Sequence, residues 1–518
     1  MPAQNPDILK LLRSNFGTYT GEIDVKHACR CLQDSELEAK SYEAEINRLE
    51  MKIIALRNRQ SIAYRRSEQY RSLLAPIRRL PPELLSHILS FCCPRNVIAF
   101  AGTEYPAICL SHVCAGWREL ARTTSSLWSS ISVFAFDNGT MPLRKREAFK
   151  EAVDLHLQLS RQAPLSLILS MRKDAEFERG ILKSICAHSS RWETLSIRLT
   201  WDLLTSNDFA HTKHKLPLLR SLDIESLAEM RTTSLDAFQD APLLTDVIIR
   251  NHKAPGMALS LPFSQLTSLT FNDCWVSGAL RLINSATQVQ HITFGVGCTE
   301  NVGGLPEGTP VLVPSQRLAV VTGAGLSIPD VFKYLTLPGL AHLSISSPFL
   351  RPCLCTNVRR SAISSLLSRA RCTLTTLVLD NVEIQDHDLV ALLQLQPLNS
   401  LTTLIIHEPR TPVTPEKTNL ALTQSFFEGI TVNYRGSLSS TLLPHLKELD
   451  LRFRAVDTFP WPVLLSMIHS RWIPDAEFSS EIGVDSLTSV ILRPLGDVKA
   501  SDMQPLQVLK AAGLLHVM

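Results

Sequence analysis

The chain has 518 residues, a length that predicts about two to four structural units rather than a single core. Hydrophobic residues make up 45% and charged residues 19%, which is the balance of a folded protein and excludes a disordered one. The formal net charge of +3 is too small to attract nucleic acid along the whole chain, and no run of about 18 or more apolar residues predicts a membrane span. We therefore expect neither nucleic acid nor a membrane as a partner.

The N-terminal sequence and the cysteines indicate the compartment. Residues 1–20 lack the apolar core and the cleavage site of a secretory signal. The 12 cysteines are scattered, and many lie in apolar runs where a reduced thiol packs as a small hydrophobic side chain. We expect a protein of the cytoplasm or the nucleus, and we assign residues 1–31 to a flexible segment.

Residues 32–74 predict a coiled-coil helix. The segment has no proline, and apolar residues recur every seven positions in two series offset by three. Acidic residues dominate its first half and arginines its second, so the helix could pair antiparallel with a copy of itself. The alternative is a single solvated helix, because Ser35, Gln60 and Ser67 interrupt the seam. The two series are Leu32, Ala39, Ile46 and Ile53, and Tyr42, Leu49, Leu56, Ala63 and Tyr70.

Residues 77–94, IRRLPPELLSHILSFCCP, predict a short apolar helix. Pro81 and Pro82 suit its first turn, where a missing amide donor costs little, and Pro94 ends it. A loop or irregular insertion then leads to a second helix, whose apolar face runs from Leu110 to Ala121. Two such short helices cannot bury a core of their own, so part of their apolar surface must be covered by other residues or by a partner.

These residues resemble the F-box, in the form common among mushroom-forming fungi. The resemblance rests on LPPELLSHILSF, then LSHVCAGWRELA, then LWSSISV, and we delimit the domain as residues 75–135. It implies a small helical unit that docks onto a Skp-type adaptor, which in turn is held by a cullin scaffold carrying the ubiquitin-transfer machinery. The sequence departs from the compact form at an insertion between Pro94 and Ile108, and at TTSSLW, where a proline often precedes Leu-Trp. The alternative is an amphipathic helix pair that leads into the next domain.

The resemblance also implies which side chains contact the adaptor. The contact would begin before the first helix, continue along its apolar face, and include the start of the second helix. Trp117 is expected to pack internally, and Arg118 to pair with an acidic group or to face water. The residues implied are Leu80, Pro81, Leu84, Leu85, Ile88, Leu89, Val113 and Cys114.

From residue 191 onward a phrase of the form L-x-x-L-x-L recurs, and such phrases stack as a solenoid. Its middle apolar residues recur at steps of 27, 25, 22 and 23 from Leu195 to Ile292, close to the leucine-rich-repeat range of about 20 to 29. Helix-like segments lie between the phrases, so each unit is expected to be a strand plus a helix. The predicted fold class is α/β, with an irregular leucine-rich-repeat-like solenoid over residues 136–518. The anchors are Leu195, Leu222, Val247, Leu269, Ile292, Leu343, Leu377, Leu404, Leu449 and Val490, and Leu318 fills one gap.

The residues beside the last leucines of each phrase are expected to share one outward face, because side chains alternate across a strand. That face mixes both signs of charge with isolated apolar residues, which suits a protein partner better than a polyanion. The alternative is a set of ordinary solvated positions. The residues expected to bind a target protein are Arg198, Asp223, Glu225, Arg250, Asn272, Asp380, His407, Asp450 and Arg452.

A search for catalytic and metal motifs identifies no site. His27 with Cys29 and Cys31, His211 with His214, and Cys353 with Cys355 lack the second half of a zinc site. The glycines of TGAGLS at 322–327 lack a nucleotide-binding context. We therefore expect no catalytic residue, no metal and no cofactor. The leading hypothesis is a substrate-receptor subunit of a ubiquitin ligase that binds a Skp-type adaptor, through it a cullin, and a target protein. The alternative is an interaction scaffold outside any ligase, with possible self-association through residues 32–74.

Overall fold

A computed structural model describes most of the chain, in two compact units of residues 1–85 and 86–518. The division falls within helix α3 (Pro82–Cys92). The described residues are 22–100, 104–136, 141–172, 176–226, 234–251, 259–299, 311–321, 331–347, 353–354, 357–410, 420–434, 441–454, 459–496, 498, 506–511, 513 and 515–517. The motif TGAGLS and Cys355 lie outside them.

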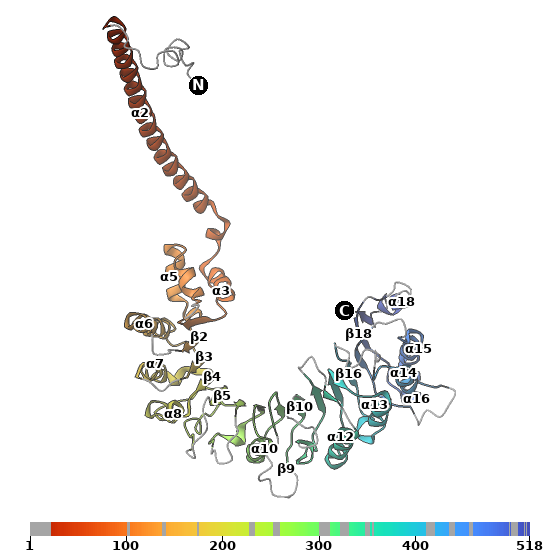
Figure 1. Cartoon of the computed structure of the whole chain (residues 1–518). Coiled ribbons are helices and arrows are strands. Elements are labelled where there is room, and N and C mark those ends of the chain that lie inside the picture. The colour runs from red at the N-terminus through yellow and green to blue at the C-terminus, as the bar shows by residue number, and fades with distance from the viewer. Residues whose placement is uncertain are drawn as a thin grey trace. The chain divides into compact units, whose positions relative to one another are not determined.

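The first unit contains the long helix that the heptads predict. Helix α2 spans Glu22–Leu74, 53 residues, and therefore extends about 80 Å (Figure 1). It begins inside the segment 1–31 that sequence analysis assigned to a flexible region. Every residue from 28 to 74 is exposed, including the apolar seam. Ion pairs three residues apart, such as Arg48 with Glu45 at 3.3 Å and Arg71 with Glu68 at 2.8 Å, support it locally.

The segment between residues 94 and 123 differs from the expected loop and single helix. It contains strand β1 (Asn96–Ala99), then two helices, α4 (Pro106–Ser111) and α5 (Ala115–Thr123). The helices separate because Cys114 is extended, with φ −160°, and its sulfur accepts a hydrogen bond from the amide of Trp117 at 3.5 Å, as an N-cap does. Arg118 is exposed, and its Nε donates to the carbonyl of Ser111 at 3.2 Å. It thereby satisfies a carbonyl at the end of α4.

One parallel sheet organises the second unit. Among the described residues, fifteen strands pair side by side in chain order, every pair parallel. Because β1 pairs with β2 and β2 with β3, the predicted boundary between residues 135 and 136 does not separate two structural units. The strands are β1, β2 (Ser130–Ala135), β3 (Leu165–Met171), β4 (Trp192–Leu199), β5 (Ser221–Ser226), β6 (Asp246–Arg250), β7 (Ser268–Asn272), β8 (His291–Phe294), β10 (Arg317–Val321), β12 (His342–Ser346), β14 (Thr376–Asp380), β16 (Thr403–His407), β17 (Glu448–Arg454), β18 (Ser489–Leu495) and β19 (Leu515–Val517).

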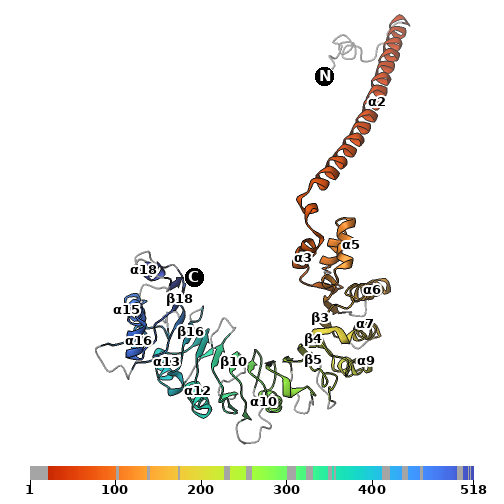
Figure 2. The same ribbon diagram turned by 180° about the vertical axis from the view of Figure 1, so that it is seen from behind.

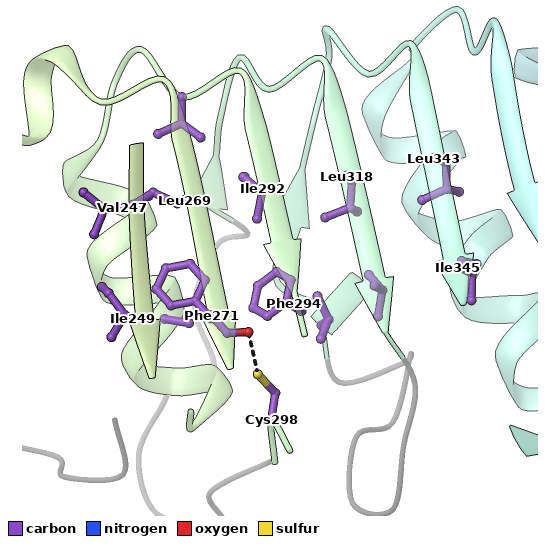
Figure 3. Close-up of a cluster of buried hydrophobic side chains, with 14 of the residues drawn as sticks. Val247, Ile249, Leu269, Phe271, Ile292, Phe294, Cys298, Leu318, Leu343 and Ile345 are labelled. Carbon is purple, nitrogen blue, oxygen red and sulfur yellow. Dashed lines mark hydrogen bonds between the residues drawn. The ribbon is translucent and has the colours of Figure 1, made fainter. Parts of the chain in front are cut away.

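The anchor residues of the repeated phrase form a single ladder across this sheet. Each predicted anchor from Leu195 to Val490 is the register partner of the next, and every one is buried. Figure 3 shows part of this ladder, with a second buried row two residues further along each strand. The thiol of Cys298, which is 1% exposed, donates to the carbonyl of Phe271 on the neighbouring strand, and Cys274 donates likewise to Ile249. Buried thiols thus satisfy carbonyls at the ends of strands.

Helices cover the face of the sheet that carries the anchors. Helices α6, α7, α10 and α12 follow the same side of the sheet in both views (Figures 1 and 2). The expectation of one helix for each strand is wrong in places: the described residues between β6 and β7 hold only a 3-10 helix, η4 (Phe263–Gln265). The helices are α6 (Leu143–Leu159), α7 (Glu176–Cys186), α8 (Trp201–Leu204), α9 (Asn207–Ala210), α10 (Val276–Ser285), α12 (Asn357–Ala370), α13 (Asp386–Leu393), α14 (Gln424–Ile430), α15 (Trp461–Arg471), α16 (Ala476–Ile482) and α18 (Leu506–Ala511).

Candidate functional site

Helix α3 presents an exposed apolar stripe. Leu84, Ile88 and Phe91 follow one another at i, i+4 and i+7, so they lie on one face of the helix. Their exposed fractions are 54%, 42% and 74%. Phe91 also holds the imidazole of His87 edge-on, with ring centroids 4.8 Å apart. A row of three large exposed apolar side chains makes this face of α3 a candidate binding surface.

The stripe corrects the set of residues that the sequence implied. Leu89 is only 1% exposed, so its side chain belongs to the core and is not available to a partner. Leu85 is half-buried. Phe91 was missed, because the adaptor residues that the resemblance implied on this helix ended at Leu89. Helical spacing counted from Leu84 would have found it.

The other implied adaptor residues lie before and after α3. Pro81 is exposed, and its carbonyl accepts the amide of Leu85 at 3.0 Å in the first turn of the helix. Leu80 is half-buried and ends the 3-10 helix η1 (Pro76–Arg79). Val113 is 59% exposed between α4 and α5, whereas Cys114 is half-buried in its capping role.

A buried polar residue holds α4 in place. Asn96 is fully buried, and its side-chain amide donates to the carbonyl of Leu127 at 2.8 Å. Its Oδ1 accepts the amide of Ala107, in the first turn of α4, at 3.3 Å. Trp128, in the 3-10 helix η2 (Ser125–Trp128), donates to the carbonyl of Ala121 in α5 at 2.7 Å. These bonds tie α4 and α5 to the first edge of the sheet.

The outward face of the sheet carries two clusters of charge. In the first, over β4 to β6, Arg198 pairs with Glu225 and Arg250 with Asp223, each at 2.7 Å. Ser196 also donates to Asp223 at 3.2 Å. The structure therefore brings together four of the predicted target-binding residues, all on the face opposite the anchors. Asn272 follows Arg250 in register and is half-buried.

The second cluster lies over β14 to β18 and centres on His407. Its Nδ1 lies 3.2 Å from Asp380 and its Nε2 lies 3.1 Å from Asp450, so both ring nitrogens face carboxylates. Arg452 contacts Asp380 at 2.8 Å. Arg493 forks onto Asp450, with Nε to Oδ1 at 2.9 Å and Nη2 to Oδ2 at 3.0 Å. The remaining four predicted residues thus meet, and Arg493 joins them although it was not predicted.

The charges of this second cluster shift one another's pKa values. Burial lowers the pKa of His407, but its hydrogen bonds with Asp380 and Asp450 outweigh burial and leave that pKa above its ordinary value. The hydrogen bond from His407 holds the pKa of Asp380 below its usual range, and Arg452 lowers it further. Burial raises the pKa of Asp450, but its bonds with His407 and Arg493 lower it overall. All three shifts favour the charged form of the group concerned.

Between the two clusters, over β7 to β12, the outward positions of the sheet mix small, polar and charged residues. They include Thr270, Ala319 and Ser344, which are half-buried, and Arg317, which is exposed.

The described residues contain no arrangement that suggests metal chemistry. Within them, no group of three or more His, Cys, Asp or Glu side chains could hold a metal ion. His214, which the sequence paired with His211, instead contacts Asp240 at 2.8 Å. No helix in the described part of the chain combines the length and the apolar character that crossing a membrane requires.

One comparison with known protein families agrees with the interpretation of residues 75–135. A family model for F-box-like domains matches residues 77–133, from η1 to β2, so the chain contains an F-box-like domain there. No curated protein is significantly similar in sequence. A chain in the crystal structure of the Rad7 and Elc1 complex in yeast is 15% identical, with 81% of this chain and 98% of that chain covered, at a TM-score of 0.25. A TM-score this low carries no argument about function.

Proposed function

We propose that the chain is a substrate-receptor subunit of a Skp-cullin-F-box ubiquitin ligase. The F-box-like domain at residues 77–133 would dock onto a Skp-type adaptor, which connects it to the cullin. The observation that supports this best is the row of exposed apolar side chains on α3, inside the matched residues. A partner that covers this row would remove the apolar surface of α3 from water.

The sheet would be the receptor for the target protein. We propose that it is a leucine-rich-repeat-like array, of the kind that follows the F-box in mushroom-forming fungi. The register ladder and the repeated phrase support this interpretation, and the two charged clusters offer contacts to a target. The chain would act by proximity, because holding a target lysine near a loaded transfer enzyme makes the reaction effectively intramolecular. It would work in the cytoplasm or the nucleus.

The experiment that tests adaptor docking is co-purification of the full chain with a Skp-type adaptor. We expect the wild type to bind, and the triple variant Leu84→Asp, Ile88→Asp, Phe91→Asp to lose binding while keeping its circular dichroism spectrum. Leu143→Asp is the matched control, since Leu143 is also an exposed leucine, at 70%, but lies on α6 outside the matched domain.

Two results would contradict the proposal. If the folded wild type does not bind the adaptor at micromolar concentrations, the ligase assignment fails and the scaffold hypothesis replaces it. If the triple variant binds as well as Leu143→Asp does, the adaptor contacts another surface than the stripe on α3.

A further inference from the structure

Helix α2 leaves a long apolar seam in water. Among its large seam residues, Ile46, Leu49, Ile53 and Leu56 are 48 to 55% exposed. They lie at a and d positions of consecutive heptads, so one partner helix would cover all four. The helix belongs to the first unit, and this inference does not depend on the proposed ligase function.

The charges beside the seam select the orientation of a partner helix. In a parallel, in-register pair, each g residue meets the e residue five positions later in the other helix. Along α2 every such contact between two charged residues would join like charges, and each would occur twice in the dimer. They are Glu38 with Glu43, Glu45 with Glu50, Lys52 with Arg57, and Arg66 with Arg71. A parallel dimer is therefore disfavoured.

We propose that α2 pairs with α2 of a second copy as an antiparallel coiled coil. In the register that places Ile46 opposite Leu56 of the second copy, Leu49 lies opposite Ile53, so the four central layers are all isoleucine and leucine. The flanking charges then form three kinds of opposite pair, each occurring twice: Glu38 with Arg66, Glu43 with Arg57, and Glu45 with Arg59. Like charges meet only at the centre, where Lys52 meets Lys52 and Glu50 meets Glu50, once each.

The same register explains the interruptions of the seam. Ser35 falls opposite Ser67 of the second copy, and Gln60 falls opposite Tyr42. The two serines thus meet each other, and Gln60 meets a tyrosine that carries a polar hydroxyl. None of the three polar residues faces an isoleucine or leucine, which lowers the cost of burying them. Ser35, Gln60 and Ser67 are the residues that favour a single solvated helix when the helix is considered alone. In the antiparallel pair these same three residues face polar groups of the second copy.

The first test is the mass of the full chain in solution, measured by sedimentation equilibrium with three charge-block variants. One variant makes the first block basic (Glu38→Arg, Glu43→Arg, Glu45→Arg). The second makes the later block acidic (Arg57→Glu, Arg59→Glu, Arg66→Glu), and the third combines both. All six positions are exposed and distant from the helix ends, so the macrodipole affects them little.

We expect the wild type and the combined variant to be dimers at micromolar concentration, and each single-block variant to be a monomer. The combined variant is the control, because it reverses every charge yet restores every opposite pair between antiparallel copies. A monomeric wild type, or single-block variants that dimerise as the wild type does, would overturn the proposal. Loss of adaptor binding by the α3 variants would leave the dimer intact, so the two proposals fail separately.

The second test determines orientation by amine cross-linking of a mixture of unlabelled and ¹⁵N-labelled chains. We expect a link between Lys52 and Lys52 of different copies, and none between Lys26 and Lys26. In the proposed register, Lys26 of one copy lies at the level of residue 76 of the second copy. Residue 76 is 50 positions from the second copy's own Lys26, so at the helical rise the two Lys26 residues are about 75 Å apart. A Lys26–Lys26 link would show a parallel pair and refute the antiparallel one.

Discussion

Two apolar side chains of α3, two residues apart, should respond to mutation in opposite ways. Leu89 is 1% exposed and Phe91 is 74% exposed. We expect Leu89→Ala to lower the free energy of unfolding by about 2 to 5 kcal/mol, because it removes a buried side chain and leaves a cavity. We expect Phe91→Ala to change that free energy by no more than about 0.5 kcal/mol, as surface substitutions do.

The effect of Phe91→Ala on adaptor affinity follows from its exposed area. A phenylalanine side chain offers about 200 Å² for burial, and three quarters of that is about 150 Å². At about 25 cal/mol per Å², covering it contributes at most about 4 kcal/mol. A tenfold change in affinity is about 1.4 kcal/mol, so the loss cannot exceed about a thousandfold. Because ordering at an interface offsets part of the gain, we expect a loss of about tenfold to a hundredfold.

The assay combines urea unfolding, followed by circular dichroism, with calorimetric titration of the adaptor at a temperature where both variants are folded. Leu143→Asp again serves as the surface control. Equal losses of affinity in Leu89→Ala and Phe91→Ala would refute the separation of core from docking surface. An unchanged affinity in Phe91→Ala would show that the adaptor does not cover the stripe.

Three further predictions concern the second unit. Arg471 is fully buried and donates to three backbone carbonyls, so we expect Arg471→Ala to destabilise the fold by about 3 to 5 kcal/mol in urea unfolding. Arg471→Lys should recover little of that stability, since a lysine cannot reach all three carbonyls. A wild-type unfolding midpoint in either variant would contradict this prediction. Because the pKa of His407 is raised in the folded state, its contribution to stability is present below the ordinary histidine pKa and is lost as the pH rises through the raised value. The difference in free energy of unfolding between wild type and His407→Gln should therefore shrink from about pH 6 to about pH 8. A constant difference would be evidence against a charged imidazole between Asp380 and Asp450. Replacing the N-cap by Cys114→Ala should lower the free energy of unfolding by about 0.5 to 1 kcal/mol, whereas Cys114→Ser should lower it less because a hydroxyl also accepts the hydrogen bond. Thermal unfolding measures this order, and a serine variant no more stable than the alanine variant would show that the sulfur does not cap α5.

The strands were predictable because burial leaves a mark in the sequence every two residues. The repeated phrase identified anchors such as Leu222 and Leu404, and alternation from those anchors placed Asp223 and His407 on the outward face. Arg493 obeys the same rule from Val490, so the rule would have found it had it been applied to the last phrase. The ion pairs themselves were not predictable, since they join residues far apart in sequence that only the register brings together.

Short elements at the N-terminal end of the sheet were harder to predict. Strand β1 has only four residues and begins with Asn96, a residue that usually indicates a turn, but here its buried amide is satisfied by backbone groups from three other positions. The division between α4 and α5 depends on a cysteine acting as a cap, which is not among the residues that normally do so. In both places a tertiary hydrogen bond determines a local structure that propensity alone does not indicate.

The register ladder has a consequence for how such a chain can change over evolution. Successive anchors remain partners whether 22 residues separate them, as between Val247 and Leu269, or 45, as between Leu404 and Leu449. Insertions and deletions between strands are therefore absorbed outside the sheet and leave the spacing of the outward residues unchanged. Point substitutions at those outward positions can then alter recognition one strand at a time, without any change in the frame that carries them.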